Sequence, residues 1–327
     1  MQLDGRKLMA DAKFYESYSR WDSNKGRYET WEESVERVMN MHRTKYADKM
    51  IPELSNDIDF CQSLYEKKAV LGAQRALQFG GEQLLKNNLK LYNCVSSHLD
   101  RPEFFGEFME LLLSGCGAGF SVQKHHIEQL PSLKPRSKTT KTHVADDSIE
   151  GWATAFDVLF SSFFSGGGKH PEYAQHPVFI DLKNIRPKGA MISGGFKAPG
   201  PEPLRKALDH VETILNKVAD EKRKLKPIEA YDCCMHMADA VISGGVRRSA
   251  CISLISKDDD EMIKAKTGDW FISNPQRGRS NNSVMLLRDE TTFEEFQKIM
   301  ESVQHSGDPG FIFTDNLEFT YNPCVFN

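Results

Sequence analysis

The sequence predicts an α/β protein in which a helical N-terminal region precedes a mostly parallel sheet. Helical spacing of apolar residues prevails as far as residue 88, and short apolar runs then alternate with amphipathic segments. Such alternation is typical of βαβ units. The 327 residues are 39% hydrophobic and 27% charged, which suits one large globular domain and a smaller one. We therefore expect a helical region over residues 1–88 and an α/β domain over residues 89–327.

The N-terminal region carries the pattern of amphipathic helices. Trp31, Val35 and Val38 fall on one face of a helix whose first turn is acidic, and residues 58–65 repeat this spacing. We expect these helices to pack together and against the domain that follows.

Beyond residue 89 the expected strands and helices alternate. Short apolar runs predict strands at 91–95, 120–122, 178–182, 246–254, 283–287 and 311–313. Amphipathic segments predict helices at 103–114, 149–164, 204–222, 228–242, 259–266 and 293–305. Gly244-Gly245 is a natural stop for the fourth of these helices. Residues 133–147 and 185–203 are expected to be long loops, and the second mixes cations, glycines and prolines in a way that suits phosphate binding.

Composition narrows the class of protein. A net charge of −4 argues against a broad nucleic-acid-binding face. Apolar runs stay short of the ~20 residues that a membrane helix needs, and residues 1–7 lack the apolar core of a signal peptide. The seven cysteines have irregular spacing, which is unlike a secreted disulfide framework. We expect a cytoplasmic protein without nucleic-acid or membrane partners.

Several short motifs have a simple structural interpretation. Residues 165–169 resemble a phosphate loop, but His170 replaces the required Ser or Thr and a helix precedes them, which favours a flexible turn. Cys233-Cys234 point in different directions on one helix, which favours core packing over metal binding. His125-His126 have no ligand partner at helical spacing, so a polar strand end is expected. We predict no metal site.

Gly115, Gly117 and Gly119 leave two interpretations open. They resemble a dinucleotide-binding fingerprint, but they follow a helix and enter a strand, which is the reverse of the required order. Glycines in this position either let a ligand approach the backbone closely or allow a tight turn.

Nine segments together resemble adenosylcobalamin-dependent (class II) ribonucleotide reductases, specifically the monomeric branch that reduces ribonucleoside triphosphates. They occur in the same order over essentially the whole chain, and the last one is Asn322-Pro323-Cys324. The others are residues 14–20, 93–94, 114–122, 186–204, 243–250, 274–277, 280–284 and 308–311.

The resemblance implies a fold and a chemistry. The fold is a ten-stranded α/β barrel of two five-stranded halves, of which this chain supplies the first half and the start of the central fingertip loop. The implied cofactor is adenosylcobalamin and the implied substrate a ribonucleoside triphosphate. A deoxyribonucleoside triphosphate effector and a thioredoxin-like reductant are the implied partners.

The resemblance also implies roles for individual residues. Cys324 matches the residue that becomes a thiyl radical, Asn322 a ribose contact, and Cys94 one cysteine of the reducing pair. The residues expected to contact substrate or effector nucleotides are Asn93, Gly115, Gly117, Gly119, Arg186, Lys188 and Lys197. The last three lie in a segment that resembles the specificity loop, and residues 133–147 resemble the neighbouring effector loop.

The C-terminal residues depart from the family pattern. Phe326 stands where the family carries a Glu, and the second reducing cysteine lies beyond residue 327 in relatives. We therefore expect either a separate C-terminal reductase portion or an interrupted gene product. The alternative is a catalytically inactive nucleotide-binding or regulatory protein derived from the same fold.

Overall fold

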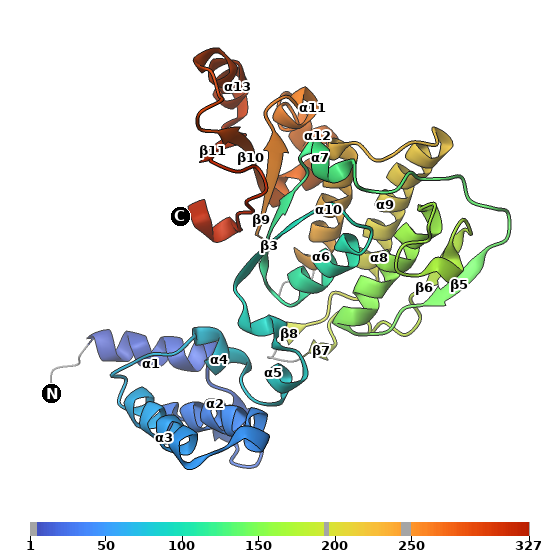
Figure 1. Cartoon of the computed structure of the whole chain (residues 1–327). Coiled ribbons are helices and arrows are strands. Elements are labelled where there is room, and N and C mark those ends of the chain that lie inside the picture. The colour runs from blue at the N-terminus through green and yellow to red at the C-terminus, as the bar shows by residue number, and fades with distance from the viewer. Residues whose placement is uncertain (1–4, 193–195, 243–249, 327) are drawn as a thin grey trace. The chain divides into compact units, whose positions relative to one another are not determined.

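The computed structural model describes residues 5–192, 196–242 and 250–326. The chain forms two compact units, Met1–Asn93 and Cys94–Asn327 (Figure 1). Among the described residues, every helix is too short or too polar to cross a membrane.

The N-terminal unit is helical around its own apolar core. Val35 and Val38 are buried there, as the helical spacing predicts. Its helices are α1 (Gly5–Ser17), α2 (Trp31–Lys45), α3 (Pro52–Glu66), α4 (Gln74–Phe79) and α5 (Glu82–Lys86). A short antiparallel pair, β1 (Trp21–Asp22) and β2 (Arg27–Tyr28), and the 3₁₀ turns η1 (Ala47–Lys49) and η2 (Asn88–Leu91) complete it.

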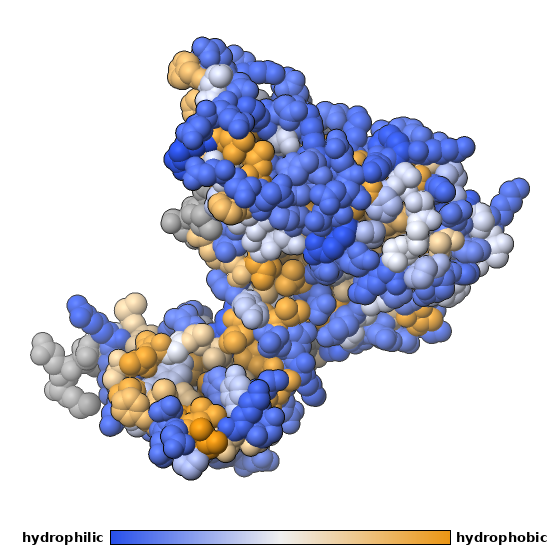
Figure 2. Space-filling model, in the orientation of Figure 1, coloured by the Kyte–Doolittle hydropathy of each residue, from blue (hydrophilic) through white to orange (hydrophobic). Residues whose placement is uncertain are grey.

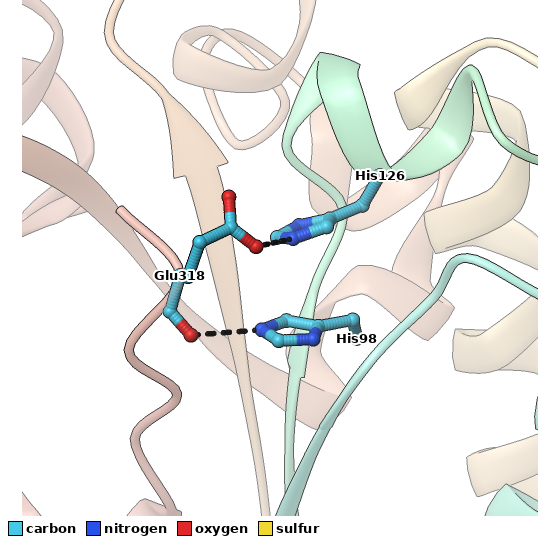
Figure 3. A group of neighbouring side chains, drawn as sticks. All are labelled: His98, His126 and Glu318. Carbon is cyan, nitrogen blue, oxygen red and sulfur yellow. Dashed lines mark hydrogen bonds and ion pairs between the residues drawn. The ribbon is translucent and has the colours of Figure 1, made fainter. Parts of the chain in front are cut away.

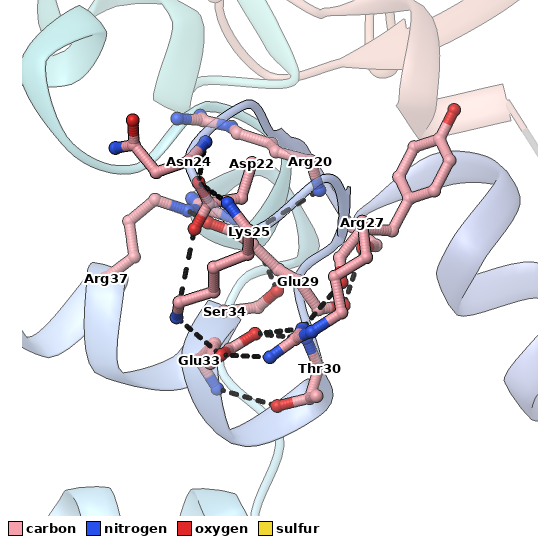
Figure 4. A network of polar contacts seen from close by, with 12 residues as sticks. Arg20, Asp22, Asn24, Lys25, Arg27, Glu29, Thr30, Glu33, Ser34 and Arg37 are labelled. Atoms are coloured by element: carbon pink, nitrogen blue, oxygen red, sulfur yellow. Dashed lines mark hydrogen bonds and ion pairs between the residues drawn. The ribbon is translucent and has the colours of Figure 1, made fainter.

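Polar contacts fix the start of α2 (Figure 4). Thr30 and Glu33 form a capping box, in which each side chain bonds the backbone N–H of the other. The Arg37 guanidinium donates to Glu29 at 2.8 Å and to the Leu77 carbonyl at 2.9 Å. The bond to Leu77 joins α2 to α4 within the N-terminal unit.

Part of the apolar surface of the N-terminal unit faces solvent. Figure 2 shows apolar side chains over its helices, and the exposed ones include Met9 on α1 (76% exposed) and Phe60 on α3 (63%). The unit therefore buries its own apolar stripes only in part.

The second unit is built on a five-stranded parallel sheet with the order β11-β10-β9-β4-β3. The strands are β3 (Cys94–His98), β4 (Gly117–Ser121), β9 (Cys251–Ser256), β10 (Ser280–Leu287) and β11 (Gly310–Thr314). The expected α/β class with a mostly parallel sheet is confirmed. A ten-stranded barrel remains a prediction.

Helices cover one face of this sheet (Figure 1). Side chains alternate along each strand, so Ile255 and Leu286 join the helix-covered core while Leu254 and Met285 face the other way. The helices that supply most of the core on this face are α6 (Phe104–Leu113), α8 (Ile149–Phe163), α9 (Glu202–Asp220) and α10 (Pro227–Ile242). Phe105 of α6 stacks on Phe160 of α8 with ring centroids 3.6 Å apart.

The remaining elements are short or lie at the edges. They are α7 (Lys124–Ile127), β5 (Lys141–Val144), η3 (Pro171–Tyr173), β6 (Val178–Asp181), β7 (Met191–Ile192), β8 (Phe196–Lys197), α11 (Asp260–Ile263), α12 (Trp270–Ser273), η4 (Pro275–Arg279), α13 (Phe293–Ser306) and η5 (Pro323–Phe326).

Some expected elements differ from the structure. The strand expected at 91–95 begins only at Cys94, because the preceding residues form η2. The segment 133–147 is not wholly a loop, since β5 pairs in parallel with β6. The expected Gly244-Gly245 helix stop, and the first residues of the strand expected at 246–254, lie outside the described residues.

Close packing of α6 on α8 depends on Gly106. A Cβ at Gly106 would overlap the carboxylate of Asp157, which is buried and accepts from Lys169 Nζ at 2.8 Å. We expect Gly106→Ala to lower the free energy of unfolding by about 1–3 kcal/mol, the usual cost of overpacking a core. Denaturant titration measures this. Gly166→Ala is the control, because a Cβ there meets nothing within 4 Å; equal stability of the two variants would contradict the prediction.

Candidate functional site: a stripe on β3 and β4

Alternate residues of two neighbouring strands form a stripe on the face opposite the helices. Cys94, Ser96 and His98 of β3 lie beside Gly117, Gly119 and Ser121 of β4, respectively. The intervening residues Ala118 and Phe120 are buried in the helix-covered core. The two-residue period of a strand therefore puts a cysteine, two hydroxyls, an imidazole and two bare glycines on one surface.

The C-terminal segment, residues 317–324, runs along this stripe. Ser96 Oγ lies 2.7 Å from Thr320 Oγ1. A Cβ at Gly119 would overlap the Tyr321 carbonyl oxygen, and a Cβ at Gly117 would lie 3.4 Å from Pro323 Cγ. The two glycines thus admit the backbone of this segment.

Apolar contacts hold the same segment from the other side. Leu317 and Tyr321 pack on a small cluster formed by the side chains of β9, β10 and β11 that face away from the helices. Its buried members are Ile252, Leu254, Met285 and Ile312.

The segment brings Cys324 to Cys94. The two residues are 230 positions apart in the sequence, their Cα atoms are 6.8 Å apart, and they form a disulfide. The Asn322 amide oxygen accepts from the Cys324 N–H at 2.9 Å, which fixes the turn that carries the cysteine. Cys324 is exposed at its end of the segment. The structure therefore gathers Cys94, Asn322 and Cys324, the three residues predicted to be catalytic.

The other end of the segment is bound through Glu318 (Figure 3). Its carbonyl oxygen lies 3.0 Å from His98 Nε2, and its carboxylate Oε2 lies 3.0 Å from Nε2 of the buried His126. Gln123 Nε2 donates to the carbonyl of Leu317 at 2.9 Å. We call His98, Gln123, His126 and Glu318 the anchor.

The hydrogen bonds assign the imidazole tautomers in the anchor. Ser121 Oγ accepts from the Gln123 backbone N–H (3.3 Å) and Nε2 (3.0 Å), so its own hydrogen is directed to His126 Nδ1 at 2.8 Å. His126 Nε2 then carries hydrogen and donates to Glu318. Burial lowers the pKa of His126, and the hydrogen bond that His126 donates lowers the pKa of Glu318. His98 Nε2 must also donate, because a carbonyl oxygen only accepts.

The hydrogens on Nε2 of His98 and His126 affect whether these residues can bind a metal ion. His98, His126 and Glu318 have donor atoms within 4.8 Å of one another and are the residue types of a zinc site. Both Nε2 atoms, however, direct hydrogens rather than lone pairs at Glu318. The two rings are also stacked 4.1 Å apart at 20°, so their in-plane lone pairs do not converge on one ion. The arrangement favours a hydrogen-bonded anchor.

The predicted nucleotide contacts are more dispersed. In the N-terminal unit, the Asn93 amide oxygen accepts from Arg75 at 3.0 and 3.1 Å. Gly115 follows α6 with φ at +81°, which suits glycine at a helix end. Lys188 and Lys197 are exposed.

The two long segments expected to bind nucleotides meet at one ion pair. Arg186 Nε donates to the Asp147 carboxylate, which joins the end of 133–147 to the start of 185–203. Gly200, with φ at +80°, lies against the Lys188 backbone, since a Cβ there would be 2.9 Å from Lys188 N. The ion pair joins the two segments, and the contact at Gly200 folds the segment 185–203 back on itself.

Sequence reasoning missed the anchor. His126 lies in the helical turn α7 rather than at a strand end. His98 carried a usable signal, because it follows Cys94 and Ser96 at a period of two residues on the same strand. Glu318 carried none, because nothing local relates it to residues 192 and 220 positions away.

Gly119 is the position at which the stripe is least tolerant of a side chain. We expect Gly119→Ala to displace Tyr321 and to lower the Cys94–Cys324 pairing about tenfold, because overpacking against backbone costs about 1–3 kcal/mol. Alkylation of free thiols followed by mass spectrometry measures the pairing. Gly278→Ala is the control, because its Cβ would meet only the Trp270 ring at 3.7 Å. Unchanged pairing in Gly119→Ala would show that the segment does not need this contact.

Comparison with known proteins agrees with the resemblance seen in the sequence. No model of a known protein family matches the chain. The adenosylcobalamin-dependent ribonucleoside-triphosphate reductase of Lactobacillus gasseri is 28% identical over 369 residues, and that of Lactobacillus leichmannii is 29% identical over 365. Each match covers 94% of this chain and 48% of the relative, so the chain spans about half the length of these relatives.

A solved structure gives the same result. The crystal structure of a B12-dependent (class II) ribonucleotide reductase aligns with a TM-score of 0.76 and 25% identity, over 93% of this chain and 49% of that one. The resemblance to class II ribonucleotide reductases is thus confirmed: in sequence and in fold, this chain is similar to about half of an adenosylcobalamin-dependent ribonucleoside-triphosphate reductase.

Proposed function

We propose that this chain takes part in the reduction of ribonucleoside triphosphates to 2′-deoxyribonucleoside triphosphates by thiyl-radical chemistry. The observation that carries the proposal is the meeting of Cys94 and Cys324 on the stripe. Similarity to adenosylcobalamin-dependent reductases supports it independently. Because those relatives are about twice as long, we propose that the reaction also needs a C-terminal reductase portion.

Cys324 is the proposed radical residue. Cys324 is an exposed residue at the end of the segment 317–324, which suits a cofactor that approaches its sulfur from outside the sheet. Adenosylcobalamin, if bound, would supply the one-electron chemistry that removes the hydrogen atom from Cys324 Sγ. The resulting thiyl takes the 3′ hydrogen of the ribose, and Asn322 holds the sugar by hydrogen bonding.

Cys94 is the proposed source of reducing equivalents. As the 2′ hydroxyl leaves as water, Cys94 and a second cysteine of the C-terminal portion give up two electrons and their protons and become a disulfide. A thioredoxin-like dithiol then restores the thiols. The Cys94–Cys324 disulfide must also be reduced before the first step, since a sulfur in a disulfide has no hydrogen to lose.

The segments joined by Arg186 and Asp147 are the proposed effector region. The exposed amines of Lys188 and Lys197 suit contact with triphosphate oxygens. A deoxyribonucleoside triphosphate bound there would influence substrate choice through the segment 185–203. Asn93, Gly115, Gly117 and Gly119 are proposed to border the substrate, although the nearest described neighbour of Gly119 is Tyr321.

The proposal is tested with a C-terminal portion of a relative supplied in trans or by fusion. With adenosylcobalamin, dithiothreitol and a ribonucleoside triphosphate, Cys324→Ser should abolish both turnover and the freeze-quench radical signal. Cys94→Ser should preserve the radical signal but lower deoxyribonucleotide formation by at least about 10³-fold, because the radical step precedes the reducing step.

Cys61→Ser is the matched control, because Cys61 is an exposed cysteine of the N-terminal unit. It should leave both readouts unchanged. Survival of the radical signal in Cys324→Ser would refute the assignment of the radical residue. Nucleotide binding without turnover by every combination of portions would favour a regulatory protein instead.

A further inference from the structure

The C-terminal segment has a fixed base and an exposed tip. Cys324 lies six positions after Glu318, and Ser96 and Gly119 border the residues between them. A thiol that must meet its partners in a defined geometry gains from a rigid support, because small displacements of a reacting group are costly in rate. The anchor is the polar support nearest the start of the segment.

We propose that His98 and His126, through Glu318, are positioning residues that set where Cys324 lies relative to Cys94. This proposal extends the proposed function, and the catalytic role that it gives to these residues rests on that function. Both imidazoles donate to the same residue, one to its backbone carbonyl and the other to its carboxylate, so they fix its main chain and its side chain together (Figure 3).

The donors themselves are held in place. His98 is the last residue of β3, and its ring stacks on His126 with centroids 4.1 Å apart. His126 is 1% exposed and receives the Ser121 hydroxyl at Nδ1. Gln123 splits its two amide hydrogens between Ser121 and the Leu317 carbonyl. Each donor is thus oriented by the sheet or by its neighbours before it meets the segment.

The negative charge of Glu318 also favours its contacts with the imidazoles. Glu318 also lies within ion-pair distance of His125, with 2.9 Å between Nε2 and Oε1, so imidazoles approach both carboxylate oxygens. A carboxylate accepts hydrogen bonds more strongly than a neutral group does. An amide at this position would keep an acceptor for His126 but lose that advantage.

The test measures the equilibrium between the Cys94–Cys324 disulfide and the two thiols in glutathione buffers. It uses the full chain in a Cys61→Ser background, with alkylation and mass spectrometry as the readout. Glu318→Ala and His98→Ala should each lower the equilibrium constant for disulfide formation about fivefold, as expected for the loss of one hydrogen bond. The double variant should lower it further than either single change. Glu318→Gln should recover part of the loss of Glu318→Ala.

The matched control is Asp258→Asn. It removes the 2.8 Å ion pair between Asp258 and Lys124 of α7 without touching the segment, so the equilibrium should not change. Thermal unfolding followed by circular dichroism should give the same midpoint for the anchor variants and the control. A change in the disulfide equilibrium below twofold in the double variant would overturn the proposal. So would an unfolding midpoint that falls in step with the equilibrium, because the anchor would then support the sheet as a whole.

The measurement needs neither cofactor nor turnover, so it judges the anchor even if the proposed reaction is wrong. In the reconstituted enzyme, Glu318→Ala should lower kcat about fivefold and leave KM unchanged, because Glu318 orients Cys324 and not the nucleotide. An unchanged kcat together with a shifted disulfide equilibrium would overturn the catalytic meaning of the anchor.

Discussion

The packing of residues 317–324 along β3 and β4 sets the positions on which the proposed chemistry depends. Two cysteines 230 positions apart meet there because the strand residues between the anchor and the thiols are small. Gly117 and Gly119 are poor strand residues in isolation, since they add backbone entropy and no packing. Ala118 and Phe120 on the opposite face are buried in the helix-covered core and hold β4 in place. Packing against the helices thus stabilises β4, although its opposite face has no side chains at Gly117 and Gly119.

Because side chains alternate along a strand, the residues that stabilise the core and those proposed to do chemistry lie on opposite faces of the sheet. Ala118 and Phe120 of β4 point toward the helices and are buried. Cys94, Ser96 and His98 of β3 point toward the C-terminal segment and are exposed or half-buried. A substitution on one face therefore changes mainly the core, and one on the other face changes mainly the segment. β3 also lies at the edge of the described sheet, so its outer side pairs with no other strand of that sheet.

Local patterns predicted much of this fold, and distant pairings accounted for most of what was missed. The helix expected at 103–114 is α6, and Phe104, Phe105 and Phe108 show why: their helical spacing is a local property of the sequence. Residues 141–144 form a strand although Lys, Thr and His dominate them, because pairing with β6 outweighs their weak intrinsic preference. The chemistry expected at Cys324 came from resemblance to a family, since no local signal places Cys324 beside Cys94. Of the three glycines expected either to allow a ligand to approach or to form a tight turn, Gly115 lies in a turn at the end of α6 and Gly119 borders the backbone of Tyr321.

The closeness of Cys94 to Cys324 has opposite consequences at different stages of the proposed reaction. Reduction of the sugar needs Cys94 near the carbon that Cys324 has activated, so the two sulfurs must approach the same small volume. Thiols held together in this way also oxidise readily to a disulfide, because their effective concentration is high. The oxidised pair has no sulfur hydrogen to donate and cannot begin the reaction. An arrangement that brings the two thiols together therefore requires reducing conditions, and the anchor that positions Cys324 for chemistry also favours the disulfide that prevents it.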